Sequence, residues 1–311
     1  MATYKDIHGF KIQNVSSDPP TSVAGDVWYN STSGDLKVNL GTPSGAWSTG
    51  GTLGTARNAA SGSGTQTAAL CFGSLSNVAD TELYNGTSWT ELNNLNSGRG
   101  YAAGCGTSTA SLDISGFSGP PYSAKALVES WNGTNWTEIT DLNTARMGGG
   151  AAGRQTTALY FGGSSTALTE SWNGSNWTEV NDLNTARSYL VGIGVSNTSA
   201  LATGGTPTKT ETEIWNGSNW TEVNNLNTGR KAMGSAGTIT AGLVFGGNPS
   251  PTAVELWNGT NWTNVTSLNQ GQEANIGAGT QPAAITMGGQ GDGTASEEWN
   301  LSGGVSTIDA S

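Results

Sequence analysis

Few side chains of this 311-residue chain could carry out chemistry. The chain has one histidine, His8, and charged residues make up only 11% of it. A serine or cysteine nucleophile needs a partner base such as histidine, and a protein copper centre needs several histidine ligands. Because one histidine near the N-terminus supplies neither, the sequence predicts no catalytic residue, no metal site and no bound cofactor.

Two pairs of acidic residues are the remaining candidates for catalysis. Hydrolysis of a glycosidic bond uses two carboxyl groups roughly 5 to 10 Å apart in one cleft. Glu297 and Glu298 are adjacent in a predicted strand, so their side chains face opposite ways. Glu211 and Glu213 share a face, but so do many solvated residues of any strand. The sequence therefore predicts a protein that is not an enzyme, with a carbohydrate-active enzyme as the disfavoured alternative.

A repeated phrase, Trp-Asn-Gly-Thr-Asn-Trp, shows which elements must position the remaining side chains. Its full copies, two of them with Ser for Thr, span 131–136, 172–177, 215–220 and 257–262. Tyr84 opens a weaker copy and Trp299 a decayed one, so the first aromatic residues lie 47, 41, 43, 42 and 42 positions apart. A period near 42 residues indicates a repeat architecture.

Other residue types keep fixed distances from this phrase. An arginine lies ten residues after the second Trp, and also after Trp47, whereas the sixth unit has Gln272 in that place. A glycine follows seven residues later, and then a short apolar run ending in glycine, such as Leu159-Tyr-Phe-Gly-Gly163. The repeated arginines are Arg57, Arg99, Arg146, Arg187 and Arg230. The tryptophans of the phrase are Trp89, Trp131, Trp136, Trp172, Trp177, Trp215, Trp220, Trp257 and Trp262.

Each unit predicts four short strands. The first, after the Arg, consists of Ala, Gly and Ser, and the second is the apolar run. The third ends at the first Trp and the fourth starts at the second Trp, with Asn-Gly between them as a strong hairpin signal. Four strands in about 42 residues, with no sustained helical periodicity, indicate an all-β protein of β-propeller architecture. We expect the small residues nearest the axis and the Trp residues in the wide outer region.

Six units predict a six-bladed propeller with four antiparallel strands per blade, and the sixth unit lacks its own fourth strand. Ala46-Trp47-Ser-Thr49 matches an isolated fourth strand, so this N-terminal strand is predicted to close the ring. The competing prediction is that Val305-Ser-Thr-Ile308 fills that place.

Over roughly residues 47 to 300 the repeat resembles kelch repeats. The shared features are the Gly-Gly after the second strand, the aromatic residue ending the third, the Trp opening the fourth and the Arg ten residues later. Repeat two departs from this pattern, with Ile114-Ser-Gly-Phe-Ser-Gly119 in place of the double glycine, as does repeat one with Phe72-Gly-Ser74. Repeat six lacks the second Trp. The resemblance implies a kelch-like propeller.

The composition excludes several classes of function. A net charge of −11 argues against nucleic-acid binding, which needs basic patches for phosphate. No run of apolar residues is long enough to predict a membrane span, and the N-terminus lacks the pattern of a secretory signal. Cys71 and Cys105 fall on different strands of their units, so we expect two buried thiols and no disulfide. The Asn-Gly-Thr and Asn-Gly-Ser sequences match the glycosylation motif, but the turns require Asn-Gly anyway, and we expect no glycan.

The first 45 residues differ from the repeat. They contain a turn-rich segment, Ser16-Ser-Asp-Pro-Pro20, and a hairpin predicted around Ser31-Thr-Ser-Gly34. This opening, with Val27-Trp-Tyr-Asn-Ser-Thr-Ser-Gly34, is similar to the start of structural and tail-fibre proteins of tailed bacteriophages, especially marine ones that infect cyanobacteria. We therefore expect two domains: a leader and hairpin at 1–45, which docks in the virion, and the propeller at 46–311.

The resemblance implies a virion protein made in the host cytoplasm. The main expectation is a non-catalytic tail-fibre or appendage adhesin that contacts the host surface, and the alternative is capsid decoration or tail assembly. Expected partners are other virion proteins, through the leader, a glycan or protein of the host surface, and further copies of this chain. A host-cell propeller with an arbitrary leader remains as another interpretation.

Repeat two is longer than the other units, and its extra residues fall between the second and third strands. Phe117, Pro120, Pro121 and Tyr122 in this loop are the predicted partner-binding residues, and the competing interpretation is a loop that only covers the blade edge. Two further tyrosines, early in the first strands of their units, are expected at the channel mouth. They are Tyr101 and Tyr189.

The recurring charges have a structural interpretation. Glutamates two residues after the second Trp accompany the repeated arginines, so we expect an Arg–Glu or Arg–Trp contact in every blade, with an anion-binding ring of arginines as the alternative. These glutamates are Glu91, Glu138, Glu179 and Glu222.

Overall fold

The computed structural model describes residues 12–19, 25–39, 44–302 and 305–307, and over these residues the secondary structure consists of strands, with no helix. The all-β class predicted from the sequence is confirmed. The chain divides into a large compact unit, 46–300, and a smaller one that combines residues before 46 with residues after 300.

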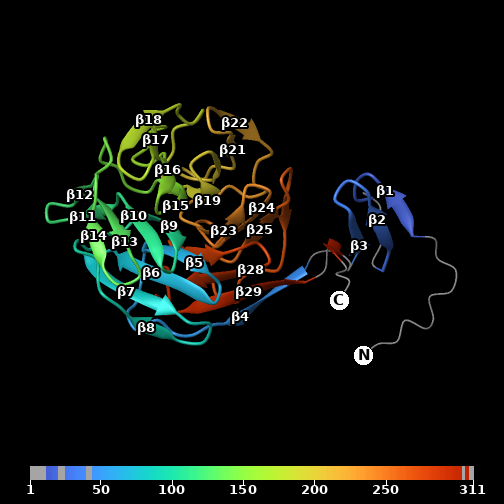
Figure 1. The fold of residues 1–311 in the computed structure, drawn as a ribbon. Helices are drawn as coiled ribbons and strands as arrows, with labels where there is room; N and C mark the ends of the chain where they lie inside the picture. Colours follow the sequence, from blue (N-terminus) through green and yellow to red (C-terminus); the bar gives the residue numbers. More distant parts are fainter. Residues whose placement is uncertain (1–11, 20–24, 40–43, 303–304, 308–311) are drawn as a thin grey trace. The chain divides into compact units, whose positions relative to one another are not determined.

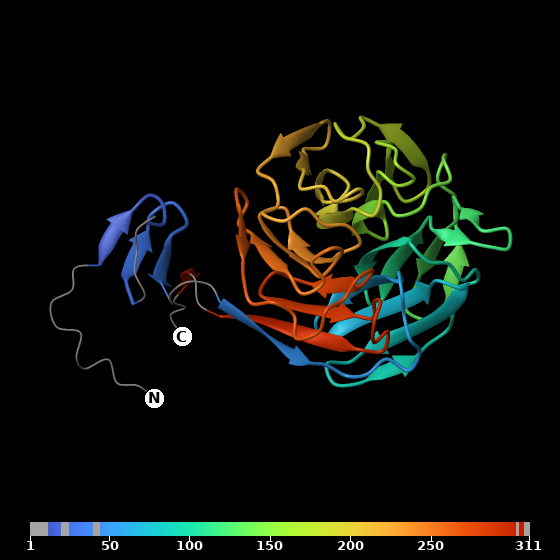
Figure 2. The same ribbon diagram turned by 180° about the vertical axis from the view of Figure 1, so that it is seen from behind.

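The large unit is a propeller of six four-stranded sheets arranged around a common axis (Figures 1 and 2). In five blades the strands follow one another in chain order from the axis to the rim, apart from two short strands inserted in blade 2. Blade 1 comprises β5 (Ser61–Thr65), β6 (Ala68–Ser74), β7 (Val78–Tyr84) and β8 (Trp89–Glu91). Blade 2 comprises β9 (Ala103–Thr107), β10 (Ala110–Ile114), β13 (Val128–Trp131) and β14 (Trp136–Glu138). Blade 3 comprises β15 (Gly150–Arg154), β16 (Thr157–Phe161), β17 (Thr169–Trp172) and β18 (Trp177–Val180).

Blades 4 and 5 repeat this plan. Blade 4 comprises β19 (Val191–Ser196), β20 (Ser199–Thr203), β21 (Thr212–Trp215) and β22 (Trp220–Val223). Blade 5 comprises β23 (Gly234–Thr238), β24 (Ala241–Phe245), β25 (Val254–Trp257) and β26 (Trp262–Asn264). The predicted Asn-Gly turns lie between the third and fourth strands, where the two Trp residues of each phrase pair directly across the hairpin.

Blade 6 is closed by a strand from the N-terminal side, as predicted. Its sheet has the order β27 (Ile276–Gly279), β28 (Ala283–Met287), β29 (Ser296–Ser302) and β4 (Ser44–Thr49). The Gly50 amide donates to the Ser296 carbonyl, and the Trp47 ring lies 5.3 Å from that of Trp299. The competing prediction for Val305–Ile308 is wrong, because β30 (Val305–Thr307) pairs with β3 (Asp35–Asn39) instead.

The first strands of the blades pack against one another around the axis through their backbones. A Cβ atom added to Gly192 would lie 2.2 Å from the Ala151 carbonyl oxygen, and one added to Gly104 would lie 2.4 Å from that of Gly62. The glycine seven residues after each Arg has a different role, since it turns the chain from the first strand to the second with positive φ, as at Gly153 (φ 127). The prediction that strand one needs small residues is thus confirmed, and the physical cause is contact between backbones.

The tryptophans fill the space between neighbouring blades. The second Trp of a phrase reaches the preceding blade: the Trp220 indole N–H donates to the Thr169 hydroxyl, and its ring contacts Phe161 at 4.8 Å. The first Trp stays in its own blade, where the Trp215 N–H donates to the Asn197 carbonyl. The hydrophobic clusters accordingly lie between blades, not within single sheets.

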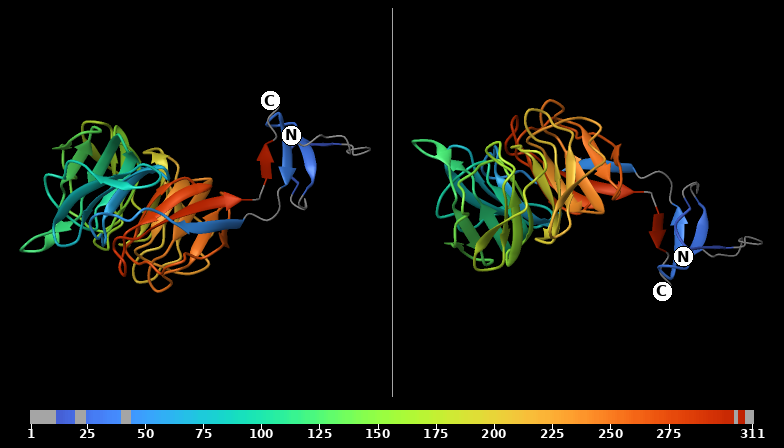
Figure 3. Two further views of the ribbon diagram at one scale, coloured as in Figure 1. Left: turned by 90° about the horizontal axis from the view of Figure 1, so that it is seen from below. Right: turned by 90° about the horizontal axis from the view of Figure 1, so that it is seen from above.

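The smaller unit is a four-stranded sheet with the order β1 (Gln13–Val15), β2 (Val27–Asn30), β3 and β30. The predicted hairpin joins β2 to β3, where the Gly34 amide donates to the Asn30 carbonyl. Both ends of the chain contribute to this sheet, so the propeller is inserted between β3 and β30, as the ribbon colours show (Figure 3). The predicted boundary at 45/46 agrees with the division of the chain, but the prediction that the propeller extends to 311 is wrong, because β30 belongs to the smaller sheet.

Candidate functional site

Each of five blades contains one buried arginine that contacts several strands of that blade. Arg230 has no exposed surface, and its guanidinium contacts the Glu255 carboxylate at 2.8 Å while donating to the carbonyls of Gly246 and Ala253. Glu255 also accepts from the backbone and side-chain amides of Asn227, which lies in the loop before the arginine. The same Arg–Glu pairs recur as Arg57–Glu82, Arg99–Glu129, Arg146–Glu170 and Arg187–Glu213.

The glutamates in these pairs come from the third strand, two residues before its final aromatic residue. The expectation of an Arg–Glu contact is therefore correct in kind but wrong in its partner. The glutamates that we expected lie on the fourth strand and are exposed: Glu91, Glu138, Glu179 and Glu222. Since the arginines are neutralised and enclosed, they do not form an exposed anion-binding ring.

Two blades depart from this arrangement. In blade 6 Gln272 replaces the arginine and accepts from the Thr286 hydroxyl, which itself accepts from the side-chain amide of Asn275. In blade 2 the guanidinium of Arg99 meets a second carboxylate, Asp113, at 2.8 Å. Burial raises the pKa of Asp113 to about 6, because Arg99 and the Ser61 hydroxyl only partly offset the lost hydration.

A closed ring of backbone hydrogen bonds surrounds the propeller axis. The residue two positions after each Arg or Gln has positive φ, and its N–H donates to the carbonyl of the equivalent residue in the preceding blade at 2.5–3.0 Å. The six members are Ala59, Tyr101, Gly148, Tyr189, Ala232 and Ala274. The ring forms one end of the axial channel, and no sequence motif predicted it.

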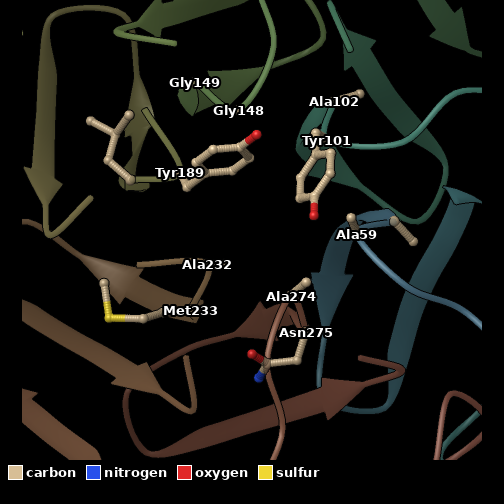
Figure 4. A pocket seen from close by; sticks show the side chains of 12 residues that line it. Ala59, Tyr101, Ala102, Gly148, Gly149, Tyr189, Ala232, Met233, Ala274 and Asn275 are labelled. Atoms are coloured by element: carbon tan, nitrogen blue, oxygen red, sulfur yellow. The ribbon is translucent and has the colours of Figure 1, made fainter. Parts of the chain in front are cut away.

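Two tyrosines of this ring border a pocket at the channel mouth (Figure 4). The rings of Tyr101 and Tyr189 meet edge to face with their centroids 4.9 Å apart, beside a cavity of about 80 Å³. None of the twelve residues that line it carries a charge. Asn275 lines it as well, and its buried Oδ1 has no hydrogen-bond donor among the described residues. Both tyrosines thus lie at the mouth, where the sequence placed them.

The long loop of repeat two forms a small hairpin, β11 (Phe117–Ser118) paired with β12 (Ser123–Ala124). It stands out from the propeller edge in green in Figure 3. The Phe117 and Tyr122 rings stack at 5.3 Å with an interplanar angle of 17°, and Tyr122 is 57% exposed. Pro120 and Pro121 form the exposed tip between them.

The hairpin is hydrogen-bonded to blade 1 and to the loop that follows it. Asn77, in the loop between the second and third strands of that blade, exchanges two hydrogen bonds with Gly119 through its side-chain amide. Phe117 and Gly100 likewise exchange two backbone hydrogen bonds, and Gly100 immediately precedes Tyr101. The two aromatic pairs are therefore connected through one backbone bridge on the same end of the propeller.

The acidic pairs considered for catalysis are engaged in other contacts. Glu213 is buried against Arg187, and Glu211 pairs with Lys209 at 2.8 Å. Glu297 accepts from backbone amides of the loop before Gln272, and Glu298 accepts from the Tyr84 hydroxyl. Neither pair is arranged as two free carboxyls across a cleft.

Among the described residues, no group of three or more histidine, cysteine or acidic side chains could hold a metal ion. Cys71 and Cys105 are free, buried thiols, as expected, and burial raises the pKa of each to about 12. His8 lies outside the described residues. A search of the described part of the chain found no helix long and apolar enough to cross a bilayer.

Fold and site together define the chain as a six-bladed β-propeller with a buried Arg–Glu layer and an aromatic end face. Its fold is similar to that of a solved structure titled "Structure of YjhT", with a TM-score of 0.68 and 11% sequence identity over 83% of this chain and 99% of that one. At this identity the likeness concerns the fold alone. No protein-family model matches the chain, and no curated protein matches it in sequence.

Proposed function

We propose that this chain is a non-catalytic virion protein of a tailed bacteriophage, used as an appendage adhesin that contacts the host surface through its propeller. The observation that carries the proposal is the β11–β12 hairpin, which carries the stacked Phe117 and Tyr122 rings and is hydrogen-bonded to blade 1 through Asn77. Exposed aromatic rings supply large contact areas at low cost in conformational entropy. The similarity of the opening residues to phage structural proteins supports the virion assignment.

We further propose that the blades are kelch repeats. Gly162 and Gly163, which end the second strand of blade 3, both have positive φ, so the double glycine has a backbone reason. The arginine ten residues after the second Trp is the buried centre of each of five blades. These features support the family likeness by structural role in addition to sequence pattern.

An assembly role, in capsid decoration or the tail, is favoured by a different observation. Val27 and Tyr29 on one face of β2 are exposed, whereas Trp28 on the other face is buried, and Ile12, just before β1, is exposed as well. We propose that this small sheet docks the protein in the particle, with other virion proteins or further copies of this chain as its partners.

Binding of purified, labelled protein to host cells tests the adhesin proposal. The double variant Phe117→Ala with Tyr122→Ala removes the stacked pair and should reduce binding at least about tenfold. Val195→Ala is the matched control, since Val195 is also exposed but lies where β19 turns into β20, at the opposite end of the strands from Tyr189. Unchanged binding of the double variant would refute the adhesin role of the hairpin.

A further inference from the structure

The axial tyrosines occupy positions where the backbone does not favour large side chains. All six ring residues have positive φ, which is uncommon for residues other than glycine and costs on the order of 1 kcal/mol or more. Four blades use Ala or Gly there: Ala59, Gly148, Ala232 and Ala274. The hydrogen-bonded ring therefore does not require tyrosine, and Tyr101 and Tyr189 need another explanation.

The pocket beside these tyrosines holds unsatisfied polar groups. The buried Asn275 Oδ1 has no hydrogen-bond donor among the described residues, and the half-buried Tyr101 and Tyr189 make no hydroxyl hydrogen bond to those residues. Buried polar groups in proteins are nearly always paired, so an unpaired acceptor at a pocket marks a place for a polar guest. The lining has no charged side chain, which suits a neutral guest that offers hydroxyl or amide groups.

A line of aromatic residues leads from the pocket to the hairpin. From the axis outward, Tyr189 contacts Tyr101, the adjacent Gly100 pairs with Phe117, and Phe117 stacks on Tyr122. The outer face of Tyr122 is open to solvent, and the tip residues Pro120–Ser123 carry no charge. Two separated ring platforms on one face suit a chain of linked rings better than a single small molecule.

We propose that this face binds a neutral polysaccharide, with one sugar unit at the axial pocket between Tyr101, Tyr189 and Asn275 and another stacked on Tyr122. The apolar faces of sugar rings pack on aromatic rings, while their hydroxyls satisfy the two phenols and the Asn275 amide. The cavity of about 80 Å³ admits part of one ring, so the remaining units lie along the surface. This inference rests on the proposed adhesin role and names the ligand class of the same face.

Calorimetric titration with neutral gluco- and manno-oligosaccharides, graded from mono- to hexasaccharide, tests the inference without cells. Affinity should rise with chain length. Tyr101→Ala with Tyr189→Ala, and separately Phe117→Ala with Tyr122→Ala, should each weaken hexasaccharide binding roughly tenfold. Alanine already occupies three ring positions, so the axial variant should keep its melting temperature. Val195→Ala should bind like the wild type.

The outcomes separate this inference from the adhesin role. Loss of binding in the hairpin variant alone, with no dependence on chain length, would overturn the axial subsite. Host-cell binding that needs the hairpin but is abolished by protease treatment of the cells, together with no oligosaccharide binding, would indicate a protein receptor and overturn the polysaccharide, while the adhesin role stands. Oligosaccharide binding without cell binding would support the site and count against the adhesin.

Discussion

Replacing the buried Arg230 by leucine should lower the free energy of unfolding by about 4 kcal/mol. The change leaves the Glu255 carboxylate buried with only the two amides of Asn227 as donors, and it leaves the Gly246 carbonyl without a donor, whereas the Ala253 carbonyl keeps the Gly246 amide. Removing one partner of a buried ion pair costs about 3–5 kcal/mol, and each orphaned acceptor adds to this. Neither group of the pair has access to water that could replace the lost contacts.

The double variant Arg230→Leu with Glu255→Leu should lose only about 1–2 kcal/mol, because two apolar side chains replace two buried charges. Only the Asn227 backbone amide and the Gly246 carbonyl stay unpaired, since the Asn227 side chain still donates to the Trp262 carbonyl. Urea unfolding followed by tryptophan fluorescence at neutral pH measures both losses. Arg154→Leu is the control, since Arg154 is exposed on β15 and should change stability by less than about 0.5 kcal/mol.

Blade 6 supplies a second test of the same reasoning. There Gln272 stands in the arginine position and accepts from Thr286, whereas the residue corresponding to Thr286 in blade 5 is Val244. Arg230→Gln combined with Val244→Thr should therefore be more stable than Arg230→Gln alone. A loss below about 1 kcal/mol for Arg230→Leu, or a double variant as unstable as the sum of the single ones, would refute the ion-pair argument.

Three further changes test other parts of the propeller. Because the pKa of Asp113 is raised from 3.8 to about 6 in the fold, its protonated form stabilises the protein at low pH, and this contribution is lost as pH rises through 6. Between pH 4 and 7, the free energy of unfolding of Asp113→Asn should rise by about 3 kcal/mol relative to that of the wild type, as measured by unfolding at several pH values. A difference between the two proteins that does not change with pH would contradict this. Gly192→Val should lower the free energy of unfolding in urea by about 1–3 kcal/mol or more. Gly242→Ala should lower it by less, because the added Cβ would lie 3.2 Å from the nearest atom. Equal losses would argue against backbone contact at the axis. Trp47→Ala should lower the free energy of unfolding by about 3–5 kcal/mol and also lower the melting temperature, because the ring packs on Phe245 and Trp299. An unchanged melting temperature would show that Trp47 does not stabilise the closure of the propeller.

The propeller itself was predictable from local patterns. Asn-Gly between two tryptophans specifies a hairpin where it occurs, and the arginine or glutamine at a fixed place in each unit specifies the number of blades. The orphan strand around Trp47 could be assigned to blade 6 because the repeat supplied a template in which one strand was missing. Such inferences need only neighbours in the sequence.

The partner of each arginine was not predictable in the same way. Glu213 and Glu222 both follow Arg187 within the same unit, and each has counterparts at the same place in other units. The structure buries Glu213 and exposes Glu222, because only the third strand lies deep enough in the blade to meet the guanidinium. Sequence spacing cannot distinguish an inner from an outer strand at this precision.

By itself, the sequence determined the fold class, the blades, the turns and the closing strand, because each depends on short segments with strong backbone preferences. Only the tertiary structure decided the axial ring of hydrogen bonds, the pairing of β30 with β3 and the bridge from Gly100 to Phe117. Each of these joins residues through backbone groups that have no sequence signature. The positions of whole blades in three dimensions determine how such groups pair. The candidate binding face could therefore be recognised only in the closed propeller.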